Sequence, residues 1–150
     1  MTGEKMKDQI TIRLNLEGDG SGELFVEFSL NGFSGKGSAW FDLAKLEDQV
    51  RNFSEFPLSI DRLPCIRGGY WNDDATEIQQ EHVYLSARPR GLAGDVIFMV
   101  RLATPVETGM DSELNYSASA ELRATYQQLS EFSTNFIRLI RGEIGEIRLG

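Results

Sequence analysis

The residues best suited to bind another molecule lie in one short stretch near the middle of the chain. Two glycines, two aromatic residues and three acidic residues follow one another closely there: Gly68, Gly69, Tyr70, Trp71, Asp73, Asp74 and Glu77. Glycine lets a ligand or another backbone approach closely, and Tyr and Trp are enriched at the energetic centres of interfaces. We therefore predict that the aromatic pair and the three carboxylates bind a partner or a ligand.

Other readings of this stretch stay open. Its carboxylates could hold a hard cation through oxygen ligands, although their spacing is not that of a calcium-binding loop. Carboxylates beside Tyr70 and Trp71 could also grip a sugar, so small-ligand binding is the alternative to protein binding. A purely structural role, in which Tyr70 and Trp71 anchor a long loop to the core, competes with both.

The sequence contains few groups of residues that could act together in catalysis. Cys65 is the only cysteine and His82 the only histidine, so zinc sites built from several of these residues are excluded. A nucleophilic pair of Cys65 and His82 is conceivable, but no spacing makes it specific. Neither a nucleophile elbow nor a phosphate-binding loop occurs. We predict no catalytic residue, no metal site and no cofactor, and a carboxylate-using enzyme is the weaker alternative.

The bulk properties narrow the class of partner. The chain has 150 residues, which fits a single domain over 1–150, with 1–8 as a disordered tail. The formal net charge of −8 disfavours nucleic acid and would steer a basic protein inward. No apolar run approaches the ~20 residues of a membrane span. A lone cysteine fits a reducing compartment, so we expect a cytoplasmic protein that does not bind membranes. The sequence leaves the oligomeric state open.

Hydrophobic periodicity predicts the elements that position these residues. Alternation over 9–41, with an Asn31-Gly32 turn, predicts a three-stranded meander. Asp42 should cap a first helix, and Thr125 with Gln128 should form a capping box for a second over 126–141. Further strands are expected over 66–71, 82–88, 96–102 and 114–123, with a short edge strand after 142. The small alanines of the 114–123 strand leave room for a helix. This order predicts an α+β fold: one antiparallel sheet of six or seven strands with two amphipathic helices on one face.

Three segments together resemble a known family. These are Phe33-Ser-Gly-Lys-Gly-Ser-Ala-Trp-Phe-Asp-Leu43, Gly-Gly-Tyr-Trp71 and His82-Val-Tyr-Leu-Ser-Ala-Arg-Pro89. They resemble small uncharacterised bacterial proteins that are grouped with immunity proteins of polymorphic toxin systems. The resemblance spans residues 10–141 and carries over no catalytic residue. It implies a cytoplasmic protein that binds and neutralises another protein.

Overall fold

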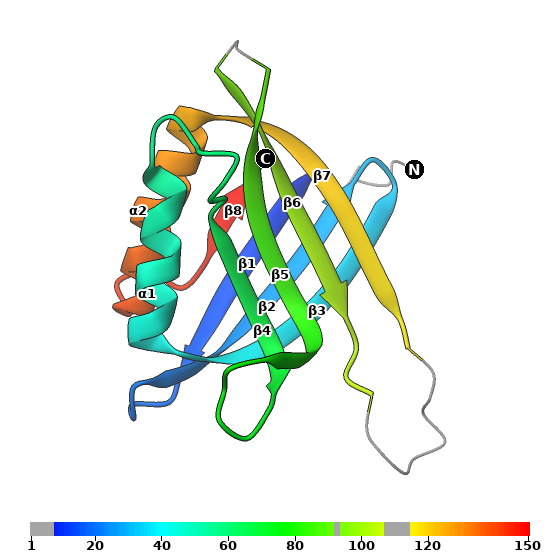
Figure 1. Ribbon diagram of the computed structural model, residues 1–150, viewed down its shortest axis with the longest axis vertical. Helices are drawn as coiled ribbons and strands as arrows, with labels where there is room; N and C mark the ends of the chain where they lie inside the picture. Colours follow the sequence, from blue (N-terminus) through cyan, green and yellow to red (C-terminus); the bar gives the residue numbers. More distant parts are fainter. Residues whose placement is uncertain (1–7, 92–93, 107–114) are drawn as a thin grey trace, which may run out of the picture.

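The computed structural model describes residues 8–91, 94–106 and 115–150, and these form two antiparallel sheets and two α-helices (Figure 1). The elements in chain order are β1 (Gln9–Leu16), β2 (Ser21–Leu30), β3 (Phe33–Asp42), α1 (Leu43–Arg51), the 3-10 turn η1 (Asn52–Ser54), β4 (Cys65–Trp71), β5 (Ile78–Arg90), β6 (Asp95–Ala103), β7 (Ser117–Thr125), α2 (Tyr126–Ile140) and β8 (Ile147–Leu149). The tail predicted over 1–8 falls almost entirely on residues 1–7, outside the described residues, as does the start of the strand expected over 114–123.

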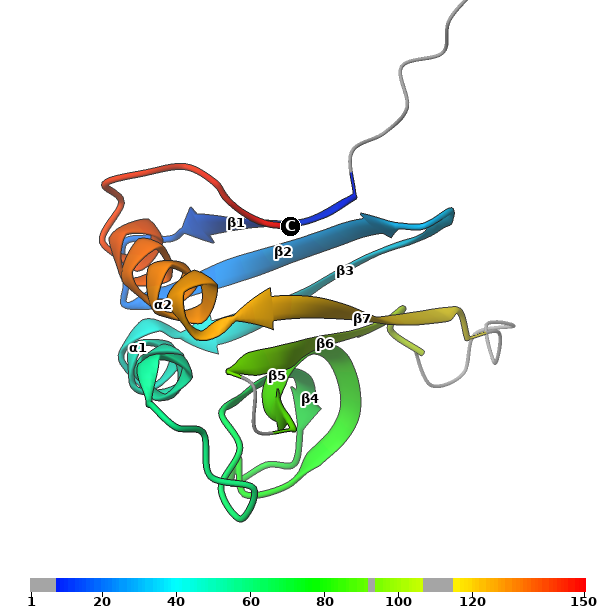
Figure 2. The same ribbon diagram turned by 90° about the horizontal axis from the view of Figure 1, so that it is seen from above.

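The prediction of a single sheet with helices on one face is wrong. The strands form two sheets of four, in the orders β3-β2-β1-β8 and β4-β5-β6-β7. Figure 2 shows the sheets as two layers, with both helices along one side of the layered pair. The α+β class and the antiparallel pairing are confirmed.

Local signals in the sequence shape the first sheet as expected. Asn31 and Gly32 both have positive φ, 51° and 85°, which is the type I′ turn that joins β2 to β3. At the end of β3, the Asp42 carboxylate accepts hydrogen bonds from the Ala44 and Lys45 amides at 3.0 and 3.1 Å. The strand therefore passes directly into α1. The capping box of Thr125 and Gln128 likewise starts α2.

Strand β3 holds the two sheets together, because it contacts all four strands of the second sheet. Its glycines permit this close crossing. A Cβ atom on Gly35 would lie 2.7 Å from the Cβ of Ala118 in β7, and one on Gly37 would lie 3.0 Å from the His82 carbonyl oxygen in β5. Ala118 therefore faces a strand, and the room predicted there for a helix is taken by β3.

The helices close the side where the sheets diverge. Helix α1 contacts β3 and β4, whereas α2 contacts β1, β7 and β8. The ring of Phe132 in α2 meets Phe98 of β6 and Phe53 of η1 edge-on, with centroids 5.2 and 5.4 Å apart. The Ser133 hydroxyl donates to the Val50 carbonyl at 3.0 Å and ties the helices together. No helix in the described part of the chain has the length and apolar character to cross a membrane.

Candidate partner-binding site

The stretch singled out in the sequence is a bulged β-hairpin made by β4 and the start of β5. Two register shifts interrupt the pairing, and each leaves one extra residue on β5, at His82 and at Gln79. Gly69 has φ of 156°, and its Cα lies so close to the Gln80 carbonyl that no side chain fits there. The hairpin therefore needs this glycine for its own backbone path, and the close approach predicted here is made by β5.

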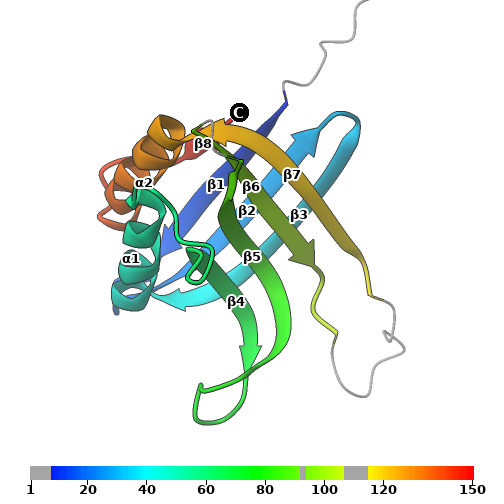
Figure 3. The same cartoon turned by 45° about the horizontal axis from the view of Figure 1, so that its top comes forward.

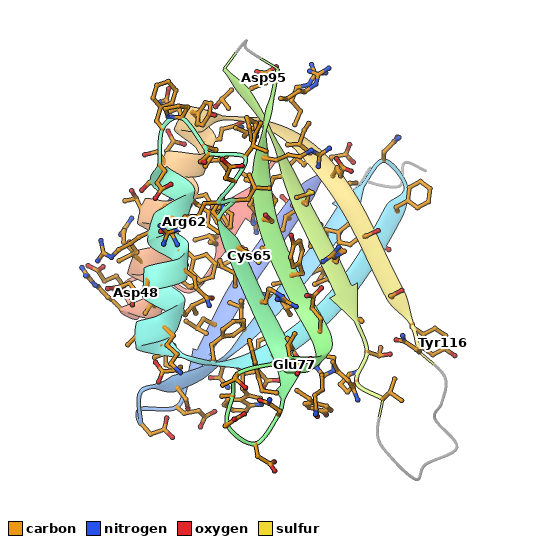
Figure 4. All side chains as sticks on the ribbon, viewed as in Figure 1. Asp48, Arg62, Cys65, Glu77, Asp95 and Tyr116 are labelled. Carbon is orange, nitrogen blue, oxygen red and sulfur yellow. The ribbon has the colours of Figure 1, made fainter. Side chains whose placement is uncertain are left out.

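Asn72 builds the acidic loop at the hairpin tip. Its side-chain oxygen accepts hydrogen bonds from the Thr76 and Glu77 amides at 2.9 and 3.1 Å. Asp73, Asp74 and Glu77 are exposed on this frame, and Figure 4 shows Glu77 where the loop leads into β5. The described residues contain no group of three or more acidic, His or Cys side chains that could hold a metal ion. The loop presents negative charge without a cation-binding cage.

The two aromatic residues have different surroundings. The Tyr70 ring meets the His82 imidazole edge-on, with ring centroids 4.6 Å apart. His82 is 3% exposed, its Nε2 lies 3.0 Å from the Gln80 side-chain oxygen, and burial lowers its pKa. The Gln80 side-chain amide in turn donates a hydrogen bond to the Val106 carbonyl and accepts one from the Val106 amide. Tyr70 therefore supports the hairpin, although 42% of it stays exposed.

Trp71 lies in a groove between the edges of the two sheets, beside the start of α1. Eight residues line it: Trp40, Phe41, Asp42, Lys45, Gln49, Arg67, Trp71 and Ala75. Its volume is about 260 Å³. Trp40 is 53% exposed and Trp71 40%, so a large part of each indole faces solvent. Two tryptophans from distant parts of the chain thus meet at one solvent-facing groove.

The polar groups of this groove differ in how far they are already engaged. Arg67 forms an ion pair with Glu81 at 2.9 Å, and Asp42 is occupied in capping α1. The side-chain oxygen of Gln49 is buried and has no hydrogen-bond partner among the described residues. Buried polar atoms are normally hydrogen-bonded, so this oxygen is an exception, but a docked donor could reach it only if the Gln49 side chain turned into the groove. The groove therefore has aromatic walls, and two of its polar side chains, Arg67 and Asp42, are already engaged.

Cys65 and His82 do not form a catalytic pair. Cys65 lies opposite Ser86 in the β4–β5 ladder, whereas the His82 ring is hydrogen-bonded to the side chain of Gln80, two residues before it. Burial raises the pKa of the Cys65 thiol to about 11. A thiol with so high a pKa holds very little thiolate at neutral pH and is a poor nucleophile.

A larger hollow of about 470 Å³ lies on the outward face of the first sheet. Its charged groups already pair with one another, because Glu27 lies 3.9 Å from Arg13 and 4.0 Å from Lys36. Asp8 and Glu27 also line an adjoining hollow, where Asp8 accepts a hydrogen bond from the Asn31 amide at 3.1 Å. These two carboxylates are both engaged, which gives the carboxylate-enzyme alternative little support.

Sequence reasoning found one side of the groove and missed the other. It identified Trp71 and the acidic loop but not Trp40, Lys45 or Gln49. Alternation along β3 could have shown that Trp40 faces away from the core, because Ala39 and Phe41 are buried on either side of it. Nothing local shows that the end of β3 lies beside the end of β4, because that proximity comes from the packing of the two sheets.

Compared with models of protein families, with curated proteins and with solved structures, the chain matches none.

Proposed function

We propose that this chain is a non-enzymatic protein-binding module whose partner docks on the Trp40–Trp71 groove. The observation that carries the proposal is the convergence of two half-exposed tryptophans on one groove beside an acidic loop. Single exposed apolar residues are common, but clustered ones mark interaction sites. Trp is also among the residues most enriched at the centres of protein interfaces.

The chemistry of the groove defines the kind of partner. Its walls suit one bulky apolar or aromatic anchor side chain, against which the stems of Lys45 and Arg67 can pack. Asp73, Asp74 and Glu77 lie on the loop that also contributes Ala75 to the groove, so basic residues should flank the anchor. A cytoplasmic immunity protein that neutralises a basic toxin domain fits this description and the family resemblance.

The test is co-purification of the tagged chain from its native host, with mass spectrometry of the bound proteins. We expect a basic protein that the wild type retains and that Trp71→Ala and Trp40→Ala lose. Phe56→Ala is the matched control, because Phe56 is 76% exposed and lies outside the groove lining. Retention of the same partner by both tryptophan variants would disprove the proposed site. If the pair is a toxin and its immunity protein, the gene of the retained partner should lie beside the gene of this chain.

Sugar binding is the second candidate, because two indole faces beside polar groups can also stack on a sugar ring. A thermal-shift screen against sugars, nucleotides and metal ions separates the two candidates. A shift that Trp71→Ala abolishes would favour a small ligand over a protein partner. Unchanged melting throughout would count against this alternative.

A further inference from the structure

The free edge of β7 is the least protected of the four sheet edges in the described residues. Strand β8 has three residues, β4 carries two register shifts, and β3 contains Lys36 and passes across the opposite sheet. Strand β7 pairs with β6 over nine residues without a register shift, and it contains neither Pro nor Lys. Natural sheets usually have such features at their edges, which hinder pairing with another chain. A regular edge without them readily pairs with another strand.

The backbone groups available on this edge can be identified. The Thr104 amide donates to the Tyr116 carbonyl at 2.9 Å, which marks these opposed residues as a hydrogen-bonded pair. Because such pairs alternate along an antiparallel ladder, the backbone groups of Ser117, Ser119, Glu121 and Arg123 point away from β6. The Thr125 amide points the same way but already donates to the Gln128 side chain at 2.9 Å. Within the part of the chain that the structure describes, the run of unpaired edge groups is therefore 117–123.

An exposed aromatic residue lies where a further strand would run. Along β3, Gly37 lies over β5 and β6, and Gly35 lies over Ala118 of β7. Phe33 is two residues further along the same face of β3, so it reaches beyond β7. It is 71% exposed. Figure 3 shows β7 at the border of its sheet with the β2–β3 hairpin extending past it.

We propose that β7 pairs with β7 of a second copy of this chain, antiparallel, with the two-fold axis at Ala120. Ser119 then lies opposite Glu121 of the second copy, and Ser117 lies opposite Arg123. All the outward backbone groups of 117–123 are paired in this arrangement. Leu122 of the second copy lies opposite Ala118, where Phe33 can cover it. The two sheets join into one continuous eight-stranded sheet across the dimer.

The charge of Glu121 and the hydrogen bond that caps α2 at Thr125 favour this register over registers in which the two-fold axis is shifted along β7. Moving the axis to Glu121 places two Glu121 carboxylates directly opposite each other, which is destabilising. Moving it to Leu122 pairs Glu121 with Arg123 but needs the Thr125 amide, which Gln128 occupies. Moving it to Ser119 places Arg123 opposite Asn115, which lies outside β7, so less of the β7 edge is paired strand to strand. This edge is separate from the Trp40–Trp71 groove, so the dimer does not depend on the proposed function.

Sedimentation of the full chain between about 1 and about 500 μM tests the dimer. The wild type should form a dimer in this range. Ser119→Pro should weaken it at least about tenfold, because the ring removes two outward donors per dimer but no bond to β6. Ser119→Ala is the control, because it keeps both amides. A monomeric wild type, or a Ser119→Pro dimer of unchanged affinity, would overturn the proposal.

Cysteine cross-linking tests the register and does not require a proline to be tolerated. In a Cys65→Ser background, Ala120→Cys places two cysteines directly opposite each other at a non-hydrogen-bonded pair, where strands approach most closely. Oxidised glutathione should cross-link it into a dimer, whereas Leu122→Cys should remain largely uncross-linked. Efficient cross-linking of Leu122→Cys in preference to Ala120→Cys would refute the two-fold axis at Ala120.

Discussion

At the residue scale, His82 shows how a bulge creates a buried titratable group. It is the extra residue at the first register shift, and it packs against Tyr70 instead of facing solvent. Burial lowers the pKa of its imidazole, so the folded protein favours the neutral ring. The hydrogen bond from His82 to Gln80, and from Gln80 to Val106, links this ring to the segment that follows β6.

The lowered pKa of His82 predicts a loss of stability in mild acid. Above the unfolded-chain pKa of about 6.5, both states hold a neutral ring and its titration has no effect. As pH falls below that value, the unfolded chain gains a proton that the folded state resists, so the free energy of unfolding falls by up to about 1.4 kcal/mol per pH unit. The fall ends once the pH passes the folded pKa.

Urea denaturation at a series of pH values between 7 and 5 measures this effect. His82→Gln is the control, because it removes the titrating ring and keeps a polar side chain. Its stability should change less with pH over this range than that of the wild type. Parallel curves for the two proteins would show that His82 does not contribute.

At the element scale, the crossing of β3 over the second sheet depends on its glycines. Gly35→Ala should destabilise the protein by roughly 1–3 kcal/mol, because the new methyl group would lie 2.7 Å from the Cβ of Ala118. Adding Ala118→Gly should restore much of the loss by removing the opposing methyl group. Denaturant midpoints of the four proteins in this double-mutant cycle give the coupling.

Gly145→Ala is the matched control for this cycle, because a Cβ atom there meets nothing within 4 Å. It should change the denaturant midpoint little. If Gly35→Ala were equally neutral, the sheets could not be in contact at Ala118.

The strand meander, both helix starts and the edge strand β8 could be predicted because their signals are local. Turn residues at Asn31-Gly32 and caps at Asp42 and Thr125 act over three or four residues. The arrangement of the strands in two sheets could not be predicted in this way. Alternation along β2 shows that Leu24 and Phe28 face inward, but not whether a helix or a second sheet covers them.

The glycines of β3 were the signal that could have indicated a second sheet. Gly35 and Gly37 are on the same face of a strand, and a repeated glycine in a strand often marks close approach of another backbone. The candidate site was half predicted for the same reason. Trp71 and its acidic loop are adjacent in sequence, whereas Trp40 reaches the groove only through the packing of β3 beside β4.

At the scale of the whole molecule, net charge and the groove should govern different steps of partner binding. The formal charge of −8 acts over distances comparable to the Debye length and speeds the encounter with a basic protein. The Trp40 and Trp71 side chains act only at contact and should set how long the complex lasts. The two contributions are therefore separable in kinetics.

Surface plasmon resonance with the co-purified partner should show this separation. Raising the salt from about 50 to about 500 mM should lower the association rate about tenfold or more and change dissociation little, because salt screens long-range attraction. The triple variant Asp73→Asn, Asp74→Asn, Glu77→Gln should show a weaker salt dependence, since it removes three charges beside the groove. Trp71→Ala should instead speed dissociation at every salt concentration. An association rate that is independent of salt would mean that the acidic charge serves solubility alone and that the partner need not be basic.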